Sequence, residues 1–488
     1  MRQAPLESEH HRSAGYAVAC AFLAALGIRA ALAWSTPVIN TDGPIYLAQA
    51  QAIMRGDFGA AVVDHNYAPG TALLVALAAR CGLSLDVAGY LVSVLAGALV
   101  VFPLYALSRA AFAPWTAIAA VFLYAFLPVP ARLSASVLTT GLFLFVSILG
   151  LALAAQLNAQ PRARTALLAG AVAAFAYLVR ADGLVLLPFA IAAAALAQDR
   201  RVAARLLLTV LVLVPSVVAV WAYGRYAHSD QGVAFTNKLR VEAVGRFLSV
   251  LSFPPARVFG LFWEDLAEAV FVLFLPFLAA GLLLRDRRGD GRLRRAWLIV
   301  LLVWSAGLLK YTDATGVMSK RYTAPLAVLL LPWVAIGAIG AARGVARVAR
   351  TGKRGSAWAP AVIVGLLCLA CVPKLLKTPG SDRLVERIAG LWVRDVAPAG
   401  KPILCGGTRV AFYAERPMAP RYLATLPIHR ALMALRRRGV EYVVCDEGLG
   451  EYAPAFVRAL QARRLPMVKR FSLAGMREVE VYRLEPLP

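Results

Sequence analysis

The sequence predicts an α-helical polytopic membrane protein of about eleven transmembrane helices, followed by a small α/β domain outside the membrane. Three observations predict this class: 60% of the 488 residues are hydrophobic, only 16% are charged, and the mean hydropathy is +0.67. A soluble domain carries about 25% charged residues. The net charge of +25 is what Arg-rich loops on the inner side of a membrane produce, so it does not by itself indicate a nucleic-acid partner.

The first apolar segment, from about Gly15 to Trp34, is long enough to cross a bilayer and too long for a signal-peptide core. We expect it to remain as an anchor, although Ala31-Leu32-Ala33 resembles a cleavage site. The stretch 68–79 is apolar but short for a span, and should lie along the interface or re-enter. The other predicted spans are 86–108, 114–128, 137–156, 166–180, 183–197, 206–224, 267–284, 297–312, 323–342 and 357–375.

Basic residues fix the orientation of these spans. With the N-terminus in the cytoplasm, the positive-inside rule holds at every inner loop. The outer side then receives the loops 35–85 and 225–266, the turn 129–136, and everything after about 377. The first of these loops is too polar to cross the bilayer, and the second contains an expected amphipathic surface helix at Asn237–Val250.

After Pro379 the composition becomes that of a soluble domain, so the predicted domains are a membrane domain at 1–377 and an α/β domain at 378–488. The expected helices are 382–395, 427–438 and 452–463, and the expected strands are 402–405, 442–445, 467–472 and 478–484. Gly406-Gly407 is expected to form a turn between a strand and a helix. Cys405 and Cys445 fall on two of these strands, where they could form a disulfide or remain buried free thiols.

Ionisable residues beside membrane segments are costly and therefore tend to be functional. In this chain they collect on the predicted outer side: Asp42, Asp64 and His65 in the first loop, Arg132 in the turn 129–136, Arg180 and Asp182 between two spans, and Lys320 and Arg321 before a later span. A carboxylate with several cations suits transfer of a sugar from a lipid phosphate. Asp42 would take the proton of the acceptor hydroxyl, and the cations would stabilise the leaving phosphate.

Each of these residues also has a purely structural interpretation. Asp42 could cap a helix that begins at Gly43-Pro44. Arg180 and Asp182 could only pair with each other, and Asp64 and His65 could be ordinary loop residues. Lys320 and Arg321 could snorkel to the interface.

No cofactor is required by these patterns. The remaining histidines form no cluster with the spacing of a zinc site. A divalent cation shared by carboxylates and a phosphate would fit the chemistry, but no spacing in the sequence demands one.

Three stretches resemble one family. Thr41-Asp42-Gly43-Pro44-Ile45-Tyr46, continued by Arg55-Gly56-Asp57-Phe58 and by His65-Asn66-Tyr67-Ala68-Pro69-Gly70, is similar to the first periplasmic loop of GT-C fold glycosyltransferases. The branch it resembles holds protein O-mannosyltransferases and lipid A aminoarabinose transferase. Tyr177 to Leu184 resembles the "TRPEG" hairpin of that branch, and Ser319-Lys320-Arg321-Tyr322 with Pro325 resembles its late "RY…P" segment.

The resemblance implies a polyprenyl-phosphate-linked sugar as donor, inversion at the anomeric carbon, and a catalytic acid in the first loop, matched here by Asp42. Tyr46 and Tyr322 join the candidate site residues because they lie in the matching stretches. The acceptor would be a lipid, a glycan or a protein at the periplasmic face of the inner membrane. The chain departs from the branch at Gly43, where Glu is frequent, and at Ala68, where Pro is frequent. A flippase for the same lipid carrier is the alternative class, although the sequence shows none of the repeated halves of many transporters.

Overall fold

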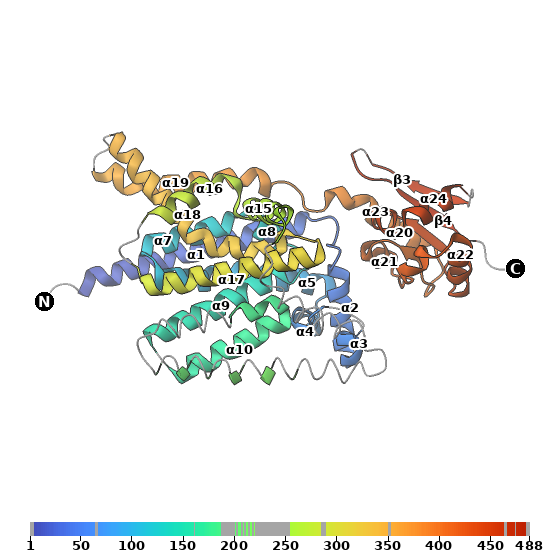
Figure 1. Cartoon of the computed structure of the whole chain (residues 1–488), viewed down its shortest axis with the longest axis horizontal. Coiled ribbons are helices and arrows are strands. Elements are labelled where there is room, and N and C mark those ends of the chain that lie inside the picture. Colours follow the sequence, from blue (N-terminus) through green and yellow to red (C-terminus); the bar gives the residue numbers. More distant parts are fainter. Residues whose placement is uncertain are drawn as a thin grey trace. The chain divides into compact units, whose positions relative to one another are not determined.

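The computed structural model describes residues 4–63, 67–160, 162–186, 254–284, 289–349, 353–462, 466–473 and 475–484, with scattered residues between 201 and 219. The chain falls into two compact units. One contains Met1–Ala33 and Gln49–Lys377, and the other contains Trp34–Ala48 and Thr378–Pro488 (Figure 1). The division therefore groups the beginning of the first loop, including Asp42, with the C-terminal part of the chain.

The described part of the chain before Thr378 is almost entirely helical. Its helices are α1 (Ala4–Ser35), α2 (Gly43–Met54), α3 (Phe58–Val63), α4 (Gly70–Arg80), α5 (Leu85–Leu99), α6 (Val101–Ala111), α7 (Pro114–Phe126), α8 (Pro128–Ser134), α9 (Thr140–Ala159), α10 (Ala163–Val179), η1 (Ala181–Val185), α15 (Ala256–Val270), η3 (Val272–Phe274), α16 (Leu275–Leu283), α17 (Gly291–Thr315), α18 (Lys320–Val348) and α19 (Lys353–Leu375). The predicted helical, multi-pass character is thus confirmed.

Among the described residues, five helices are long and apolar enough to cross a membrane, or up to seven if each of two bent pairs forms one span. The spans predicted at 183–197 and 206–224 lie largely outside the described residues, as does the surface helix predicted at Asn237–Val250. The total of about eleven spans therefore stays a prediction.

Two bends differ from the expected elements. The region predicted as a turn, 129–136, is largely helical, since it contains most of α8. Helices α7 and α8 meet at a bend of 58°, where Pro128 lacks a backbone N–H donor. The predicted span 267–284 is broken at Phe271, whose φ of 74° lies in the left-handed region, and α15 and the helices after it meet at 84°. Helix α15 begins at Ala256, inside the region predicted as a loop, directly after Pro254-Pro255, and Pro255 occupies its N-cap position.

Helix α18 lies in the middle of the first unit, where it packs against α7, α15, α16 and α19. The contact with α16 depends on two glycines. A Cβ on Gly281 would lie 1.8 Å from the main-chain oxygen of Trp333, and one on Gly337 would lie 1.9 Å from that of Phe277. Small residues allow helix backbones to approach this closely within a membrane, where apolar burial does not drive helices together.

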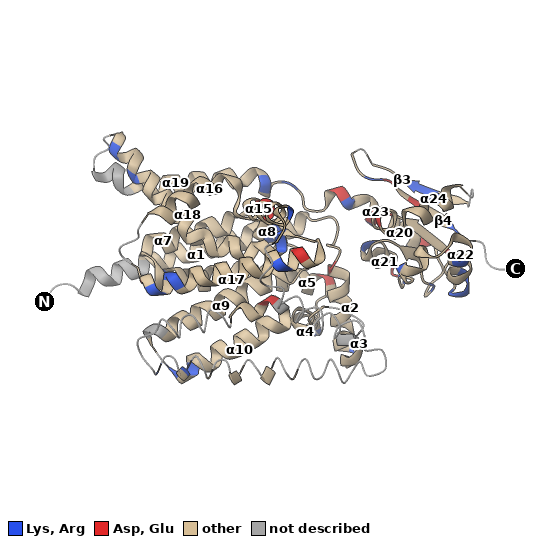
Figure 2. Ribbon diagram, viewed as in Figure 1, with Lys and Arg blue, Asp and Glu red and all other residues tan. Residues whose placement is uncertain are grey.

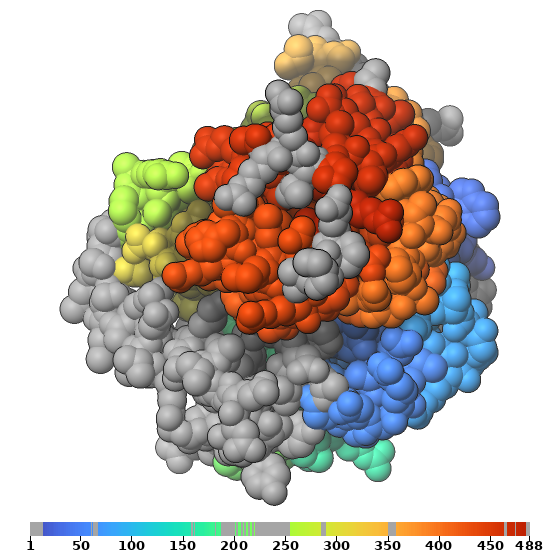
Figure 3. Space-filling view, turned by 90° about the vertical axis from the view of Figure 1, so that its right-hand side faces the viewer, coloured from blue at the N-terminus to red at the C-terminus, as the bar shows by residue number. Residues whose placement is uncertain are grey.

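The second unit contains a four-stranded sheet in the order β1-β2-β4-β3. Its strands are β1 (Leu404–Cys405), β2 (Tyr442–Cys445), β3 (Met467–Phe471) and β4 (Val479–Arg483), and its helices are η4 (Ser381–Arg383), α20 (Leu384–Val396), α21 (Thr408–Ala414), η5 (Arg421–Thr425), α22 (Ile428–Arg437), α23 (Glu447–Tyr452) and α24 (Pro454–Ala462). Strands β1 and β2 are parallel, whereas β2–β4 and β3–β4 are antiparallel. In Figure 3 the atoms of the C-terminal part, drawn in orange and red, lie together in one block.

Both faces of β2 are covered, as its fully buried pattern requires. On one face Tyr442 and Val444 pack with residues of α20 and α21. On the other face Val443 and Cys445 pack with residues of α22 and α24. The alternation follows from the two-residue period of a strand. The domain therefore has three layers, with helices on either side of the sheet.

The two cysteines of this sheet do not form a disulfide. Cys405 and Cys445 are both buried free thiols. Burial raises the pKa of both, to about 12 for Cys445. They therefore act as small apolar side chains of the core.

Candidate functional site

A buried arginine forms the first of two groups of charged residues in the helical unit. Arg180 follows α10, and its side chain is only 10% exposed. It pairs with Asp182 in η1 and donates to the main-chain oxygen of Arg321 at 3.2 Å. Its guanidinium lies over the rings of Phe143 and Tyr322, 4.8 and 5.0 Å from their centroids. The aromatic faces replace part of the lost hydration of this cation, so its orientation is fixed by internal partners.

Arg321 and Tyr322 complete this group at the start of α18. Arg321 donates from Nη2 to the hydroxyl of Tyr322 at 3.2 Å, and its guanidinium lies 5.2 Å from the Tyr322 ring. The hydroxyl of Tyr322 also lies 3.4 Å from that of Tyr311 on α17. The group therefore joins α10, α17 and α18, and it brings together four of the predicted site residues: Arg180, Asp182, Arg321 and Tyr322.

The second group centres on a carboxylate. Glu268 of α15 accepts from Lys320 at 2.7 Å, and Lys374 of α19 lies 3.8 Å from its other oxygen. Lys320, Glu268 and Lys374 are 44%, 38% and 43% exposed. Arg132 of α8 is anchored beside them, because it donates to the main-chain oxygen of Lys374 at 3.0 Å. Two cations from two helices thus flank one partly exposed carboxylate, and a third cation, on α8, is hydrogen-bonded to the backbone of one of them.

The two groups are continuous, since Lys320 of one precedes Arg321 of the other. Figure 2 shows these charges at the end of the helical unit where α8 and α15 are labelled, while other basic residues lie at its opposite end. The described cations are Arg132, Arg180, Lys320, Arg321 and Lys374, and the carboxylates beside them are Asp182, Asp265 and Glu268. The surplus of positive charge suits a phosphate or diphosphate, which Arg binds through a planar fork and Lys as a point charge.

Asp42 belongs to the other compact unit. It directly precedes α2, and its main-chain oxygen accepts from the amides of Ile45 and Tyr46 at 3.1 and 3.3 Å. Its backbone therefore occupies the N-cap position that its sequence context suggested. The side chain is half-buried, and Tyr46 is buried one turn into the helix. Helix capping and base catalysis are compatible roles for one carboxylate.

Two predicted site residues, Asp64 and His65, lie outside the described residues. Among the residues that the structure does describe, no three His, Cys, Asp or Glu side chains are grouped so that they could hold a metal ion.

The sequence analysis missed Glu268 and Lys374, although a signal was present. Both lie inside apolar segments that were predicted to span the membrane, where an ionisable residue indicates a function. What the sequence could not show is that they meet, because their contact joins α15 to α19.

A third missed residue, Arg29, is fully buried in α1. It donates from Nε to the hydroxyl of Ser134 at 2.9 Å and from Nη1 to the main-chain oxygens of Ala25 and Ala125 at 3.1 and 3.4 Å. Its guanidinium lies 4.7 Å from the centroid of the Tyr124 ring. Since Ser134 ends α8, Arg29 ties the first helix to the short helix that carries Arg132.

The fold and the charges at one end of its helices define a class: a polytopic membrane protein with a cluster of cations at one end of its helical unit. A family model described as dolichyl-phosphate-mannose-protein mannosyltransferase matches residues 65–223. No curated protein sequence matches the chain significantly.

Solved structures agree with this class. ArnT from Cupriavidus metallidurans in the apo state is similar with a TM-score of 0.65 and 15% identity over 98% of this chain and 100% of that one. The same protein bound to undecaprenyl phosphate gives 0.60 and 15%, over 94% and 97% of the two chains. The oligosaccharyltransferase AglB from Archaeoglobus fulgidus, in complex with an inhibitory peptide and a dolichol-phosphate, gives 0.54 and 13%, over 89% and 69%. The chain has the GT-C fold of membrane glycosyltransferases, and the predicted resemblance is confirmed.

Proposed function

We propose that the protein is an inverting glycosyltransferase that moves a sugar from a polyprenyl phosphate to a lipid, glycan or protein acceptor. The fold supports this, since one similar structure is an oligosaccharyltransferase in complex with a dolichol-phosphate and another is ArnT bound to undecaprenyl phosphate. The observation that carries the proposal is the pair of charged groups at one end of the helical unit, in which cations outnumber carboxylates.

In this proposal the Lys320 group receives the donor phosphate. The pairs of Glu268 with Lys320 and Lys374 are partly exposed, so each contributes little energy and can be exchanged. A phosphate entering between the two lysines would replace the carboxylate, and Arg132 would add a third cation. Positive charge at this place stabilises the phosphate that leaves the anomeric carbon, which is where negative charge develops.

Asp42 supplies the base. Its carboxylate takes the proton of the acceptor hydroxyl as the new glycosidic bond forms, and the bond from the anomeric carbon to the phosphate oxygen breaks with its electrons going to the phosphate. Attack opposite the leaving phosphate inverts the anomeric configuration. Asp64 and His65 are further candidates of the same loop for this chemistry.

The proposed location is the inner membrane of a bacterium, with the charged end of the bundle, the first loop and the C-terminal domain on the periplasmic side. This orientation follows the positive-inside rule applied to the Arg-rich loops. A divalent cation is not needed for the proposed steps.

The test uses purified protein in nanodiscs, a pool of polyprenyl phosphates carrying labelled sugars, and a membrane extract as acceptor. Wild-type protein should move label from lipid to acceptor, and Asp42→Asn should lower the rate by about 10²- to 10⁴-fold, since it loses a general base. If wild-type protein moves no label from any donor while it carries labelled lipid across liposome membranes, the chain is a flippase and the proposal is wrong.

A further inference from the structure

The segment that leads to Asp42 is bound along its length by the C-terminal domain. Arg387 of α20 donates to the main-chain oxygen of Pro37 at 2.6 Å, and the amide of Ile39 donates to the hydroxyl of Tyr413 at 2.8 Å. Thr408 donates from its hydroxyl to the main-chain oxygen of Thr41. Residues 37, 39 and 41 thus offer backbone groups to the same two helices, α20 and α21, as alternate residues do along one edge of an extended chain.

The last contact before Asp42 is made by an arginine whose direction is fixed by a second partner. Arg409 of α21 donates from Nη1 to the hydroxyl of Thr41 at 2.6 Å. Its other nitrogens form a fork with Glu386 of α20, with Nε to Oε2 at 2.5 Å and Nη2 to Oε1 at 3.0 Å. The Glu386 side chain is only 7% exposed, so this pair is shielded from water. A two-point pair of this kind sets the direction of the guanidinium as well as its place.

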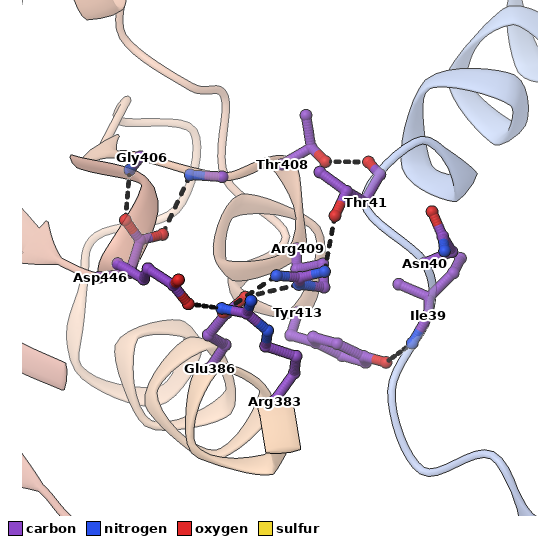
Figure 4. A network of polar contacts seen from close by, with 12 residues as sticks. Ile39, Asn40, Thr41, Arg383, Glu386, Gly406, Thr408, Arg409, Tyr413 and Asp446 are labelled. Carbon is purple, nitrogen blue, oxygen red and sulfur yellow. Dashed lines mark hydrogen bonds and ion pairs between the residues drawn. The ribbon is translucent and has the colours of Figure 1, made fainter. Parts of the chain in front are cut away.

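The network continues from Glu386 to the sheet (Figure 4). Arg383 bonds both Glu386 and Glu447. Beside Glu447, the buried Asp446 accepts from the amides of Gly406 and Gly407 at 2.9 and 3.0 Å. The close approach explains the glycine at 406, because a Cβ there would lie 1.7 Å from the amide nitrogen of Leu449. The turn that presents Thr408 and Arg409 to the first loop is therefore fixed to the carboxyl ends of β1 and β2.

Asp42 stands directly after this anchored segment. Its amide donates to the side chain of Asn40 at 3.3 Å, and the amide of Gly43 donates to the main-chain oxygen of Asn40 at 2.9 Å. Asn40 and Thr41 thus form the turn between the anchored residues and α2. A shift of Thr41 must shift the carboxylate of the next residue.

We propose that the C-terminal domain is a positioning module for the base, in which Glu386 orients Arg409 and Arg409 holds Thr41 so that Asp42 keeps its place. This rests on the proposed function and assigns a role to the domain that follows the membrane helices. Arg409 and Glu386 are positioning residues, since they act on the reaction through Thr41 and Asp42. Misplacement of a catalytic group by about 1 Å can cost on the order of 10²-fold in rate.

The test compares three substitutions in the full-length enzyme: Thr41→Val, Arg409→Ala and Arg409→Lys. Thr41→Val keeps the shape of the side chain and removes only the hydroxyl, so it leaves the pair of Glu386 and Arg409 intact. We expect Thr41→Val to lower kcat about tenfold and Arg409→Ala about 100-fold, with the KM for the lipid donor unchanged. Arg409→Lys keeps the charge without the fork and should fall between wild type and Arg409→Ala.

The matched control is Lys401→Ala, which removes an exposed ion pair with Glu441 in the same domain, away from the first loop. It should leave kcat at the wild-type value. Thermal unfolding of each variant identifies any that fails to fold, and Thr41→Val decides the question if Arg409→Ala does not fold.

Unchanged kcat in folded Thr41→Val and Arg409→Ala would overturn the proposal, as would a rise in donor KM at constant kcat, which would assign the domain to donor binding. An inactive wild-type enzyme would instead refute the glycosyltransferase function itself. The two failures are therefore distinguishable.

Discussion

The two charged groups of the helical unit differ in how deeply their cations are buried and in which groups hold them. Arg180 is 10% exposed and is surrounded by Phe143, Tyr322, Asp182 and the oxygen of Arg321. Lys320 is 44% exposed, and it forms an ion pair with a carboxylate that is itself 38% exposed. The first cation is enclosed by internal groups, whereas the second pairs with an exposed carboxylate that, in the proposed function, the donor phosphate displaces. Under that proposal, the difference assigns structural and phosphate-binding roles to neighbouring cations.

The largest expected effect is on stability, at Arg180. Arg180→Ala leaves Asp182 without its guanidinium and opens a cavity between Phe143 and Tyr322, so it should lower the free energy of unfolding by about 3 kcal/mol. Lys320→Ala should cost less than about 1 kcal/mol, as expected for an exposed pair. Denaturant unfolding of the two variants in detergent measures both. Equal losses would show that the groups do not differ in this way.

The next effect is on donor binding, at Lys320. Lys320→Ala removes one charge-assisted hydrogen bond to the donor phosphate, so it should weaken the affinity for polyprenyl phosphate about tenfold. The matched control is Arg347→Ala, which removes an exposed cation from the other end of the same helix, α18. Titration in nanodiscs should show weaker binding only for Lys320→Ala, and weaker binding in both variants would indicate a general effect of charge.

The smallest effect has the opposite sign. Glu268→Gln removes the carboxylate that competes with phosphate for Lys320 and Lys374, so affinity for polyprenyl phosphate should rise about two- to fivefold. The same titration checks it, and the gain should shrink with added salt because screening weakens exposed pairs. A lower affinity would mean that Glu268 orients the lysines for the donor and does not compete with it.

Local patterns were sufficient to predict much of this molecule. The strand at Tyr442–Cys445 was predicted with the bounds that the structure shows, because a short apolar run between polar turns has few other interpretations. Arg180, Asp182 and Arg321 were singled out as charged residues beside spans, Tyr322 was added through the family resemblance, and the structure brings these residues together.

What the sequence could not predict depends on long-range packing. The break at Phe271 has no glycine or proline at the left-handed residue, so no local signal marks it. Arg29 was overlooked in an apolar run, and its partner Ser134 lies on α8. The grouping of the Asp42 segment with the C-terminal domain rests on contacts such as that of Thr41 with Arg409, which join distant parts of the chain.

The most direct test of this account measures binding and chemistry on the same preparation. Polyprenyl-phosphate affinity and single-turnover sugar transfer would be determined for wild type, Asp42→Asn and Lys320→Ala in nanodiscs. The account predicts that Asp42→Asn keeps its affinity and loses transfer. Lys320→Ala should lose affinity and, because one cation is then missing beside the leaving phosphate, should also transfer more slowly at saturating donor, though faster than Asp42→Asn. If Asp42→Asn transferred sugar at the wild-type rate, Asp42 would not be the base, and the central claim would be contradicted.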